Sequence, residues 1–440
     1  MTDIPAQRAK TSSLLFDPIW ILFCIALLLR ILWAGVANPY EQHDPHKHLP
    51  ALFSVLQLQS PVIDAGPYYY AIVAIASLPL VGLLKLGLLN EKQFLTLATA
   101  WSGALLQGIF MYGCLLLARR LRFRADAQFV FVALCTFFPP LQRSFGMLRP
   151  ENLIAAGSPY VCALFVSLWR GTSISCFGAG LIVVMAAQKI SGLFLVAGLT
   201  ASTVVFRPKL IIWRRSALLI CAALVVLFVG QRVATGYWFF ETEWFADPHY
   251  YQTTPTIDLF LRFNPLAAWQ RPFRNAHKDS MLNILLIDMF GDYWRYGIDH
   301  ASVPNHPKWR LFRARLGIAS AIAFVCFYFS GLFALARQPT PYLKERRLLS
   351  AIFFVGPAML VLATLNGYAA EKFDIIKWEY ILPFVPLLMI PSAHLLDTSL
   401  SRQKRWLVTG VGSVIISAGV FQSIHLYNRN LWDVPIPLPW

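Results

Sequence analysis

Residues 41–50 read EQHDPHKHLP and follow soon after the first long apolar run of the chain, residues 17–37. The ten residues hold three histidines and two acids, which the hydrocarbon core of a bilayer accepts only at high cost. A polar stretch of this kind after an apolar run of about 20 residues marks the place where a chain leaves the membrane. The run is therefore predicted to be a first membrane-spanning helix that the protein retains.

The composition of the whole chain is that of a membrane protein. Of its 440 residues, 57% are hydrophobic and only 14% are charged, and the mean hydropathy is +0.55. A soluble globular domain carries about 25% charged residues, so this chain could not cover its apolar surface with polar side chains. The net charge of +16 is read as cytoplasmic anchoring by Lys and Arg, and nucleic acid is not expected as a partner.

Apolar segments recur along the sequence and predict an all-α polytopic membrane protein with about 11 transmembrane helices. The strongest segments are residues 17–37, 94–118, 126–142, 151–168, 173–188, 190–206, 214–231, 314–335, 347–366, 376–396 and 405–425. A weaker segment, residues 68–89, is interrupted by Pro79, Gly82, Lys85 and Gly87.

Basic clusters set the expected orientation, because Lys and Arg concentrate in cytoplasmic loops. They lie at Arg8/Lys10, at Arg119–Arg124, at Arg207–Arg215, at Lys344–Arg347 and at Arg402–Arg405. If all are cytoplasmic, the chain crosses an even number of times between the first two clusters, although three apolar segments lie there. The weakest, residues 68–89, is therefore expected to be a juxtamembrane or re-entrant hairpin on the outer side.

This orientation divides the chain into three regions. Residues 1–231 would form an N-terminal transmembrane catalytic module with a first outer loop at 38–93, residues 232–313 a long outer loop, and residues 314–440 a set of C-terminal transmembrane helices. The short polar turn 143–150 and the stretch 367–375 would also lie outside. The seven cysteines fall in or beside apolar segments without CxxC spacing, so no structural disulfide and no thiolate metal site is expected.

The first outer loop holds the first candidate site residues. Asp44 precedes an amphipathic stretch that begins near Pro45, so Asp44 is either a helix N-cap or a carboxylate held at the membrane surface as a general base. His43, His46 and His48 are expected to contact substrate. Their spacing is not a clean metal motif, which leaves no certain cofactor and a divalent metal open.

A second group of candidates comes from the turn RSFGMLRPENL, residues 143–153. Pro150 and Glu151 suit the start of a helix. Arg143 and Arg149 are not explained in that way, since positive charge outside runs against the usual bias, and two arginines suit a phosphate. Lys189, between two short apolar segments, is either a functional intramembrane lysine or a snorkelling one.

The long outer loop adds aromatic and acidic residues. Its stretch LIDMFGDYWRYGID includes Asp292 and Trp294, which suit a sugar ring through stacking and hydroxyl hydrogen bonds, or alternatively an interfacial aromatic belt. A basic patch at its end would clamp a lipid-linked phosphate, unless the orientation is wrong there; it comprises Lys308, Arg310, Arg313 and Arg315.

Taken in order, these motifs resemble the GT-C superfamily of integral-membrane glycosyltransferases, and most of all its branch of protein O-mannosyltransferases and lipid A aminoarabinose transferases. The resemblance is carried by the acidic loop EQHDPHKHLP, by GPYYY at 66–70, by LRPENL at 148–153 and by KWEYILPFVPLLMI at 377–390. FGDYW at 290–294 is similar to a segment in bacterial members. The motifs are scattered over most of the chain.

The resemblance implies roles for individual residues. Asp44 matches the first-loop catalytic acid, Arg149 and Glu151 match the second-loop pair, with Glu151 as a second catalytic residue, and Lys189 matches a lysine that ends the corresponding span. Tyr69 lies in the aromatic element and is expected to contact substrate. Two departures stand out: Asp-Pro-His replaces Asp-Glu in the first loop, and Ala-Gly-Pro replaces His-Pro-Pro before the tyrosines, so no histidine acts there.

The function implied by the resemblance is transfer of a sugar from a polyprenyl-phosphate-linked donor to an acceptor hydroxyl on a lipid, glycan or protein. The reaction would take place at the extracytoplasmic face of a bacterial inner membrane or its equivalent, by direct displacement with inversion. Asp44 would be the base, and Arg and Lys side chains would hold the phosphate among membrane lipids. Two alternatives remain: a lipid or glycan transporter or flippase, which would show repeats and broken helices, and an O-antigen ligase or polymerase.

Overall fold

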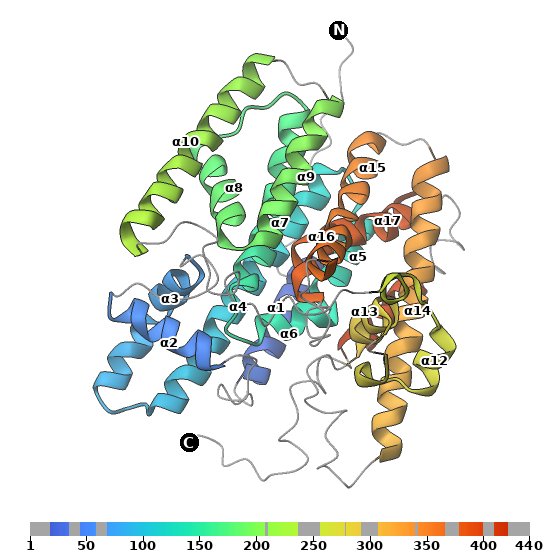
Figure 1. Cartoon of the computed structure of the whole chain (residues 1–440), viewed down its shortest axis with the longest axis horizontal. Coiled ribbons are helices and arrows are strands. Elements are labelled where there is room, and N and C mark those ends of the chain that lie inside the picture. The colour runs from blue at the N-terminus through green and yellow to red at the C-terminus, as the bar shows by residue number, and fades with distance from the viewer. Residues whose placement is uncertain are drawn as a thin grey trace.

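The computed structural model describes residues 18–34, 45–58, 68–206, 210–235, 256–277, 279–291, 307–338, 342–365, 378–398 and 409–420. Within these ranges every regular element is a helix, and Figure 1 shows long helices packed side by side with shorter ones at their ends. The predicted all-α polytopic class is confirmed, because apolar stretches with the helical period recur without any strand among the described residues.

The N-terminal helices are α1 (Pro18–Ala34), α2 (Pro45–Leu56), α3 (Tyr68–Lys85), α4 (Glu91–Arg120), α5 (Ala125–Thr136), α6 (Pro139–Phe145), α7 (Glu151–Trp169), α8 (Cys176–Gln188), α9 (Ile190–Phe206) and α10 (Leu210–Thr235). The later ones are α11 (Ile257–Leu261), α12 (Pro265–Gln270), η5 (Arg274–His277), α13 (Met281–Phe290), α14 (Pro307–Arg337), α15 (Leu343–Ile352), α16 (Val355–Ala363), η8 (Trp378–Phe384) and α17 (Val385–Thr398). A last described helix covers Thr409–Val420.

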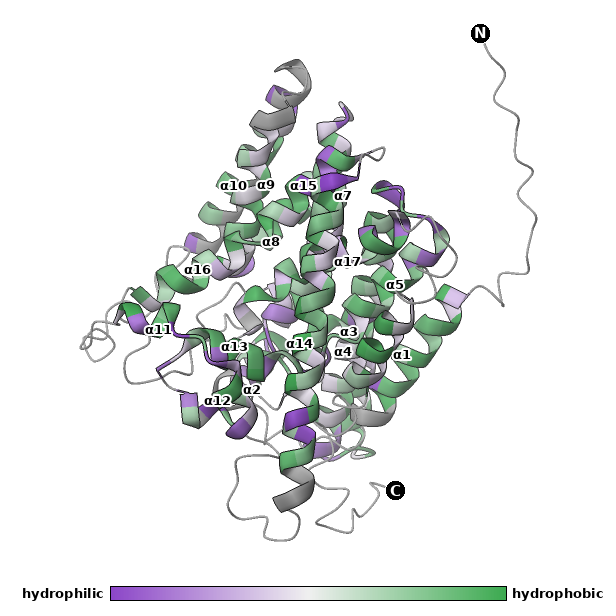
Figure 2. Cartoon of the chain, turned by 90° about the vertical axis from the view of Figure 1, so that its right-hand side faces the viewer, coloured by the Kyte–Doolittle hydropathy of each residue, from purple (hydrophilic) through white to green (hydrophobic). Residues whose placement is uncertain are grey.

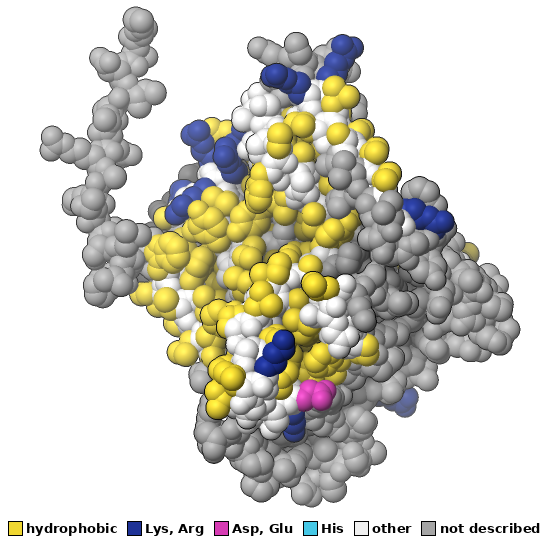
Figure 3. Space-filling view, turned by 90° about the vertical axis from the view of Figure 1, so that its left-hand side faces the viewer, with side chains coloured by type: hydrophobic (Ala, Val, Ile, Leu, Met, Phe, Trp, Pro, Cys, Tyr) yellow, Lys and Arg dark blue, Asp and Glu magenta, His cyan; other side chains and the backbone are white. Residues whose placement is uncertain are grey.

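The bundle has the surface of a protein that lies in lipid. Six described helical segments are long and apolar enough to cross a bilayer: Tyr68–Lys85, Glu91–Arg120, Glu151–Trp169, Leu311–Arg337, Leu343–Ala363 and Tyr380–Thr398. Large apolar side chains such as Leu78 and Trp101 lie exposed on its outside. Figure 3 shows one face with a broad apolar band below a group of Lys and Arg side chains, and Figure 2 shows hydrophilic residues gathered toward the helix ends. The chain is an integral membrane protein.

One end of the bundle collects basic residues and is called the basic end below. The C-terminal ends of α4, α7 and α17 meet the first turns of α5 and α15 there. Arg346, which is 1% exposed, donates to the carboxylate of Asp397 (2.7 Å) and to the carbonyl of Leu121 (2.9 Å). Arg170 donates to Glu345 (2.9 Å). The clusters at 119–124 and 344–347, which were expected on one side of the membrane, therefore meet in the structure.

Several predicted spans are interrupted. The segment 126–142 forms α5 and then α6, because Pro139 and Pro140 lack the N–H groups that would continue α5 and instead begin a new helix. Likewise, 347–366 divides into α15 and α16, and 376–396 begins as the 3₁₀ helix η8 before α17. The long loop 232–313 is not wholly irregular, since it contains α11 to α13, and α14 begins inside it at Pro307.

The position of α6 is fixed from the interior of the bundle. Arg30 of α1 is 1% exposed and donates to the Gln107 side chain (2.8 Å) and to both the side-chain and backbone oxygens of Gln142 (2.6 Å each). A Cβ atom at Gly103 of α4 would collide with the carbonyl oxygen of Phe145, so only glycine allows α6 to approach α4 this closely. These contacts hold the turn that follows α6 at the end opposite the basic end.

The weaker apolar segment forms α3, whose length and composition alone would allow a crossing. Its first turn contacts the end of α8 through Tyr69 and Gln188. α6 meets α4 at Gly103, so the first residues of α4, from Glu91, extend roughly 18 Å beyond that contact, at 1.5 Å per residue. α3 packs on α4 and joins it through the short link 86–90. α3 and the start of α4 thus form a helical hairpin opposite the basic end, and that this segment adds no membrane crossing stays a prediction.

Candidate active site

A buried ion pair joins the start of α7 to the end of α8. Glu151 is the first residue of α7, after Pro150, and its carboxylate accepts from the ammonium group of Lys189. The two side chains are 4% and 16% exposed. Lys189 follows the last residue of α8 in an extended conformation, and its ammonium lies 5.6 Å from the centre of the Tyr380 ring. Two of the residues predicted from the sequence are therefore in direct contact.

The turn at Lys189 is shaped by close packing of α8 against α9. A Cβ atom at Gly192 would collide with the carbonyl oxygen of Met185, whereas one at Gly180 on the outer side of α8 would meet open space. Glycine at position 192 therefore allows the two helices to meet within one turn of Lys189. Lys189 lies in this turn, and from there its ammonium reaches Glu151.

Tyr69 connects the two segments that carry the ion pair. Its hydroxyl accepts from the backbone N–H of Arg149 (2.9 Å), and its own backbone N–H donates to the Gln188 side chain (3.2 Å). Tyr69 is 1% exposed, Arg149 2% and Gln188 0%. We refer to Tyr69, Arg149, Glu151, Gln188 and Lys189 as the ion-pair cluster.

The helix that follows the first predicted loop is tied to the same place. His48 of α2 is buried, and its Nδ1 shares a hydrogen bond of 2.5 Å with the hydroxyl of Tyr70. The rings of Tyr70 and Tyr69 pack edge to face at 5.1 Å. α2 begins at Pro45, directly after Asp44, so these contacts fix the helix next to the predicted base against the ion-pair cluster.

Arg143 belongs to a different group of buried residues. Its guanidinium donates to the backbone carbonyl of Asp288 in α13 (2.7 Å), and the Asp288 carboxylate pairs with Arg274 (2.7 Å). Arg143, Arg274 and Asp288 are 3%, 5% and 0% exposed and form a second buried group, the arginine cluster. These contacts dock α13 and η5 onto α6. A phosphate-binding role for Arg143 stays a prediction.

Both clusters bring buried cationic side chains together. In the ion-pair cluster Arg149 and Lys189 lie with Glu151, and in the arginine cluster Arg143 and Arg274 both contact Asp288. Glu151 also stands at the N-terminus of α7, where the helix dipole adds partial positive charge. Cationic groups and a helix N-terminus in apolar surroundings favour an anion.

The remaining predicted site residues lie wholly or partly outside the described residues. Asp44, His43, Asp292 and Trp294 lie outside them altogether. His46 belongs to α2 by its backbone, but its side chain lies outside the described part. No group of three or more His, Cys, Asp or Glu side chains that could hold a metal occurs among the described residues. The divalent metal left open by the sequence, and the roles of these five residues, stay predictions.

Sequence reasoning missed three residues of these clusters. Gln188 lies beside Lys189 in MAAQK, where a polar amide inside an apolar run was a signal that could have found it. Tyr380, under the Lys189 ammonium, lies in the quoted stretch KWEYILPFVPLLMI. Arg274 had no such signal, because its partner Asp288 is brought close only by the fold.

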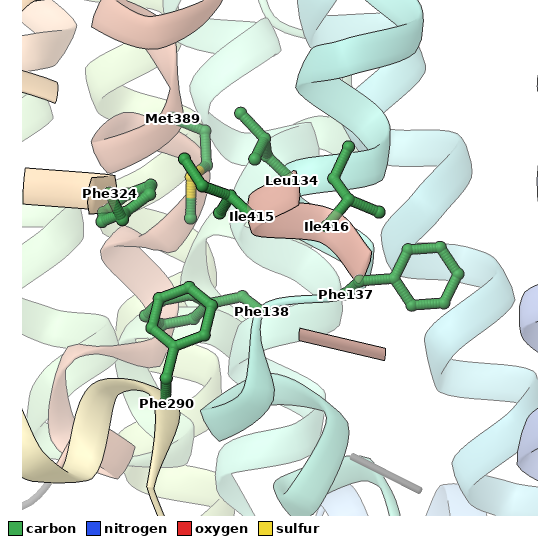
Figure 4. Close-up of a pocket in the computed structure, with 8 residues that line it drawn as sticks. All are labelled: Leu134, Phe137, Phe138, Phe290, Phe324, Met389, Ile415 and Ile416. Carbon is green, nitrogen blue, oxygen red and sulfur yellow. The ribbon is translucent and has the colours of Figure 1, made fainter. Parts of the chain in front are cut away.

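A separate small pocket lies where α5, α13, α14, α17 and the helix Thr409–Val420 meet. Figure 4 shows its eight lining side chains, all apolar: Leu134, Phe137, Phe138, Phe290, Phe324, Met389, Ile415 and Ile416. The Phe138 and Phe290 rings stand perpendicular at 6.2 Å. Such a pocket offers no group for acid–base or electrostatic catalysis, so the candidate chemistry belongs to the ion-pair cluster.

Solved structures provide the comparison with known proteins. ArnT from Cupriavidus metallidurans, determined with undecaprenyl phosphate bound, superposes with a TM-score of 0.51 at 13% identity, covering 93% of this chain and 75% of that one. The arabinofuranosyltransferase AftD from Mycobacteria gives 0.46 at 16% identity, over 93% of this chain and 27% of that one. The Archaeoglobus fulgidus oligosaccharyltransferase in the apo form gives 0.47 at 12% identity, over 95% and 56%.

The chain thus spans about a quarter of the length of AftD and three quarters of that of ArnT. No protein-family model and no curated protein matches its sequence. At this level of identity the match with ArnT concerns the fold. The all-α polytopic fold expected from the sequence is confirmed: this chain is an integral membrane protein whose fold is similar to that of ArnT.

Proposed function

We propose that the protein is a membrane glycosyltransferase that moves a sugar from a polyprenyl-phosphate-linked donor to an acceptor hydroxyl at the extracytoplasmic face. The observation that carries the proposal is the buried ion-pair cluster, which brings Arg149, Glu151 and Lys189 together at the end of a GT-C bundle opposite the basic end. The comparison with ArnT, which was solved with undecaprenyl phosphate, supports a donor of this lipid class.

The depth of the cluster suits a donor that arrives through the membrane. Glu151 begins α7 and Lys189 follows the end of α8, so both lie at helix ends, where lipid headgroups and phosphates are found. A polyprenyl phosphate diffusing in the bilayer would bring its phosphate to this level. Lys189 and Arg149 would then stabilise the negative charge that grows on the phosphate as the sugar leaves.

The proposed reaction is a single displacement. A carboxylate, Asp44 in this proposal, takes the proton of the acceptor hydroxyl while the oxygen attacks the anomeric carbon. The bond between that carbon and the phosphate oxygen breaks, and the phosphate keeps the electron pair, so the configuration inverts. Glu151 acts on this step by orienting the Lys189 ammonium. α2, which is fixed by His48, would hold Asp44 at the right distance.

The test uses purified full-length protein in lipid nanodiscs with labelled hexose and pentose polyprenyl phosphates and a panel of lipid, glycan and peptide acceptors. We expect release of polyprenyl phosphate together with a labelled acceptor. Lys189→Gln and Asp44→Asn should lower this turnover by a factor on the order of 100 or more. Lys92→Gln, at an exposed lysine in the first turn of α4, is the matched control and should leave turnover unchanged.

Three outcomes would contradict the proposal. Movement of the lipid-linked sugar across a bilayer without cleavage would identify a transporter or flippase. Turnover only with long lipid-linked glycans would identify a ligase or polymerase. Equal turnover in the wild type and in Lys189→Gln would remove the ion-pair cluster from the reaction.

A further inference from the structure

Tyr69 occupies an unusual position between two distant parts of the chain. As the second residue of α3 it has a backbone N–H without a partner inside the helix, and the Gln188 side chain accepts from it. At its other end, the phenol oxygen accepts from the backbone N–H of Arg149. The two bonds join segments 119 and 80 residues away in sequence. The ring itself is 1% exposed.

The partners of Tyr69 are the residues next to the ion pair. Gln188 directly precedes Lys189, and Arg149 is separated from Glu151 only by Pro150. Peptide groups are planar, and Pro150 fixes its own φ. Bonds that restrain Arg149 and Gln188 therefore restrict the backbone of Glu151 and Lys189 as well. One residue, through its backbone N–H and its hydroxyl, thus contacts the neighbours of both the carboxylate and the ammonium.

The segment after Arg149 is also braced within itself. The Ser144 hydroxyl donates to the Asn152 side chain (2.5 Å), which in turn donates to the carbonyl of Met147 (2.8 Å). These bonds give the turn its shape but do not reach α8. Both the Glu151–Lys189 ion pair and the bonds of Tyr69 join this turn to the end of α8, and Tyr69 does so through the neighbouring residues Arg149 and Gln188.

We propose that Tyr69 is a positioning residue that sets Glu151 and Lys189 relative to each other, instead of a contact to the sugar. The catalytic part of this inference rests on the proposed function. The structural part does not, because it concerns two segments that one tyrosine contacts at the same time.

The kinetic experiment replaces Tyr69 by Phe in the full-length protein in nanodiscs. The change keeps the ring and the bond to Gln188 but removes the acceptor for Arg149. We expect kcat for release of polyprenyl phosphate to fall by about 10- to 100-fold, with little change in KM, since orientation matters most in the transition state. Tyr68→Phe, at the partly buried neighbour, is the control and should be unchanged.

Two further variants sharpen the kinetic result. Gln188→Met removes the other bond and should lower kcat to a similar extent. Tyr69→Phe added to Lys189→Gln should cost no more than Lys189→Gln alone, because a positioning residue acts through the group it positions. A raised KM with unchanged kcat in Tyr69→Phe would show a direct contact with the donor and overturn the inference.

Hydrogen exchange tests the positioning without any turnover. Tyr69→Phe and Gln188→Met should each raise amide exchange in both segments, 146–153 and 186–192, while Tyr68→Phe raises it in neither. Loosening of only the segment next to the lost bond would overturn the inference. If the wild type released no polyprenyl phosphate, the proposed function would fail, and the exchange data would still decide the role of Tyr69.

Discussion

The ion pair between Glu151 and Lys189 is built from two residues that an apolar environment penalises when they are separated. Its side chains are 4% and 16% exposed, and Lys189 also lies over the Tyr380 ring. If one of the two charges is buried there without its partner, nothing offsets the free energy of removing it from water. Both residues can therefore be recognised as site candidates in the sequence, because a charged side chain in or beside an apolar segment needs a partner of opposite charge.

This reasoning predicts unequal effects of single and double substitutions. Lys189→Gln should lower the free energy of unfolding by up to about 3–5 kcal/mol, since the Glu151 carboxylate stays buried. Adding Glu151→Gln should recover most of that loss and none of the activity. Thermal unfolding in detergent measures the stability, and donor turnover measures the activity. If the double variant is as unstable as the single one, the pair has no role in holding α7 against α8.

The basic end shows a single residue serving several helices. Arg346 contacts Asp397 and His394 of α17, the carbonyls of Leu121 and Arg122 after α4, and the Phe123 ring at 4.2 Å. The planar guanidinium reaches these partners in several directions, which an ammonium group cannot do. A buried arginine at this place is therefore a structural residue.

We expect Arg346→Lys to be destabilising although it keeps the charge. The loss should be about 2–4 kcal/mol, from two or more charge-assisted hydrogen bonds at about 1.5–3 kcal/mol each, partly replaced by those that lysine can make. Arg120→Lys is the control, because Arg120 is the exposed last residue of α4. It should change stability by less than about 0.5 kcal/mol. Equal unfolding temperatures for the two variants would contradict this role for Arg346.

At the scale of elements, α8 and α9 show how packing places the site. Gly192→Ala would force the carbonyl of Met185 away and separate the two helices beside Lys189. We expect a loss of about 1–3 kcal/mol in unfolding free energy and lower donor turnover. Gly180→Ala lies on the same helix pair where a Cβ meets open space, so it should be neutral or slightly stabilising. A thermal melt and a turnover assay of both variants check the prediction; equal effects would contradict it.

The same elements show what a sequence can and cannot predict. Apolar length predicted α1, α4, α7 and α9 within a few residues of their ends, because in lipid each helix satisfies its own backbone groups. The division of 126–142 into α5 and α6 could have been read from the Pro139–Pro140 pair. The helices α11 to α13 could not, because short segments are stabilised by the groups they dock onto. Trp378 donating to the Leu285 carbonyl (2.8 Å) is such a contact.

Site residues follow the same division. Arg149, Glu151 and Lys189 were predicted, since a charge in or beside an apolar segment is costly wherever it lies. The contact of Arg149 with Tyr69 and that of Arg143 with Asp288 depend on approach between segments 80 and 145 residues apart. No local pattern encodes such approach, and only the packed bundle reveals it.

At the scale of the whole molecule, the exposed Lys and Arg side chains of the basic end predict an orientation. Arg120 and Lys344 lie at the basic end, whereas Glu91 begins α4 at the other end, near α3. Lys and Arg remain on the cytoplasmic side during membrane insertion, so the ion-pair cluster should face the extracytoplasmic side. A polyprenyl-phosphate donor used outside the cell membrane requires this arrangement.

Cysteine labelling in intact cells tests the orientation. In a variant whose seven cysteines are replaced, Glu91→Cys should react with a membrane-impermeant maleimide, while Arg120→Cys and Lys344→Cys should react only after permeabilisation. Glu91 and Arg120 end the same helix, so each serves as the control for the other. Labelling of Arg120→Cys and Lys344→Cys from outside would place the basic end there and the ion-pair cluster on the cytoplasmic side. Transfer at the outer face would then fail.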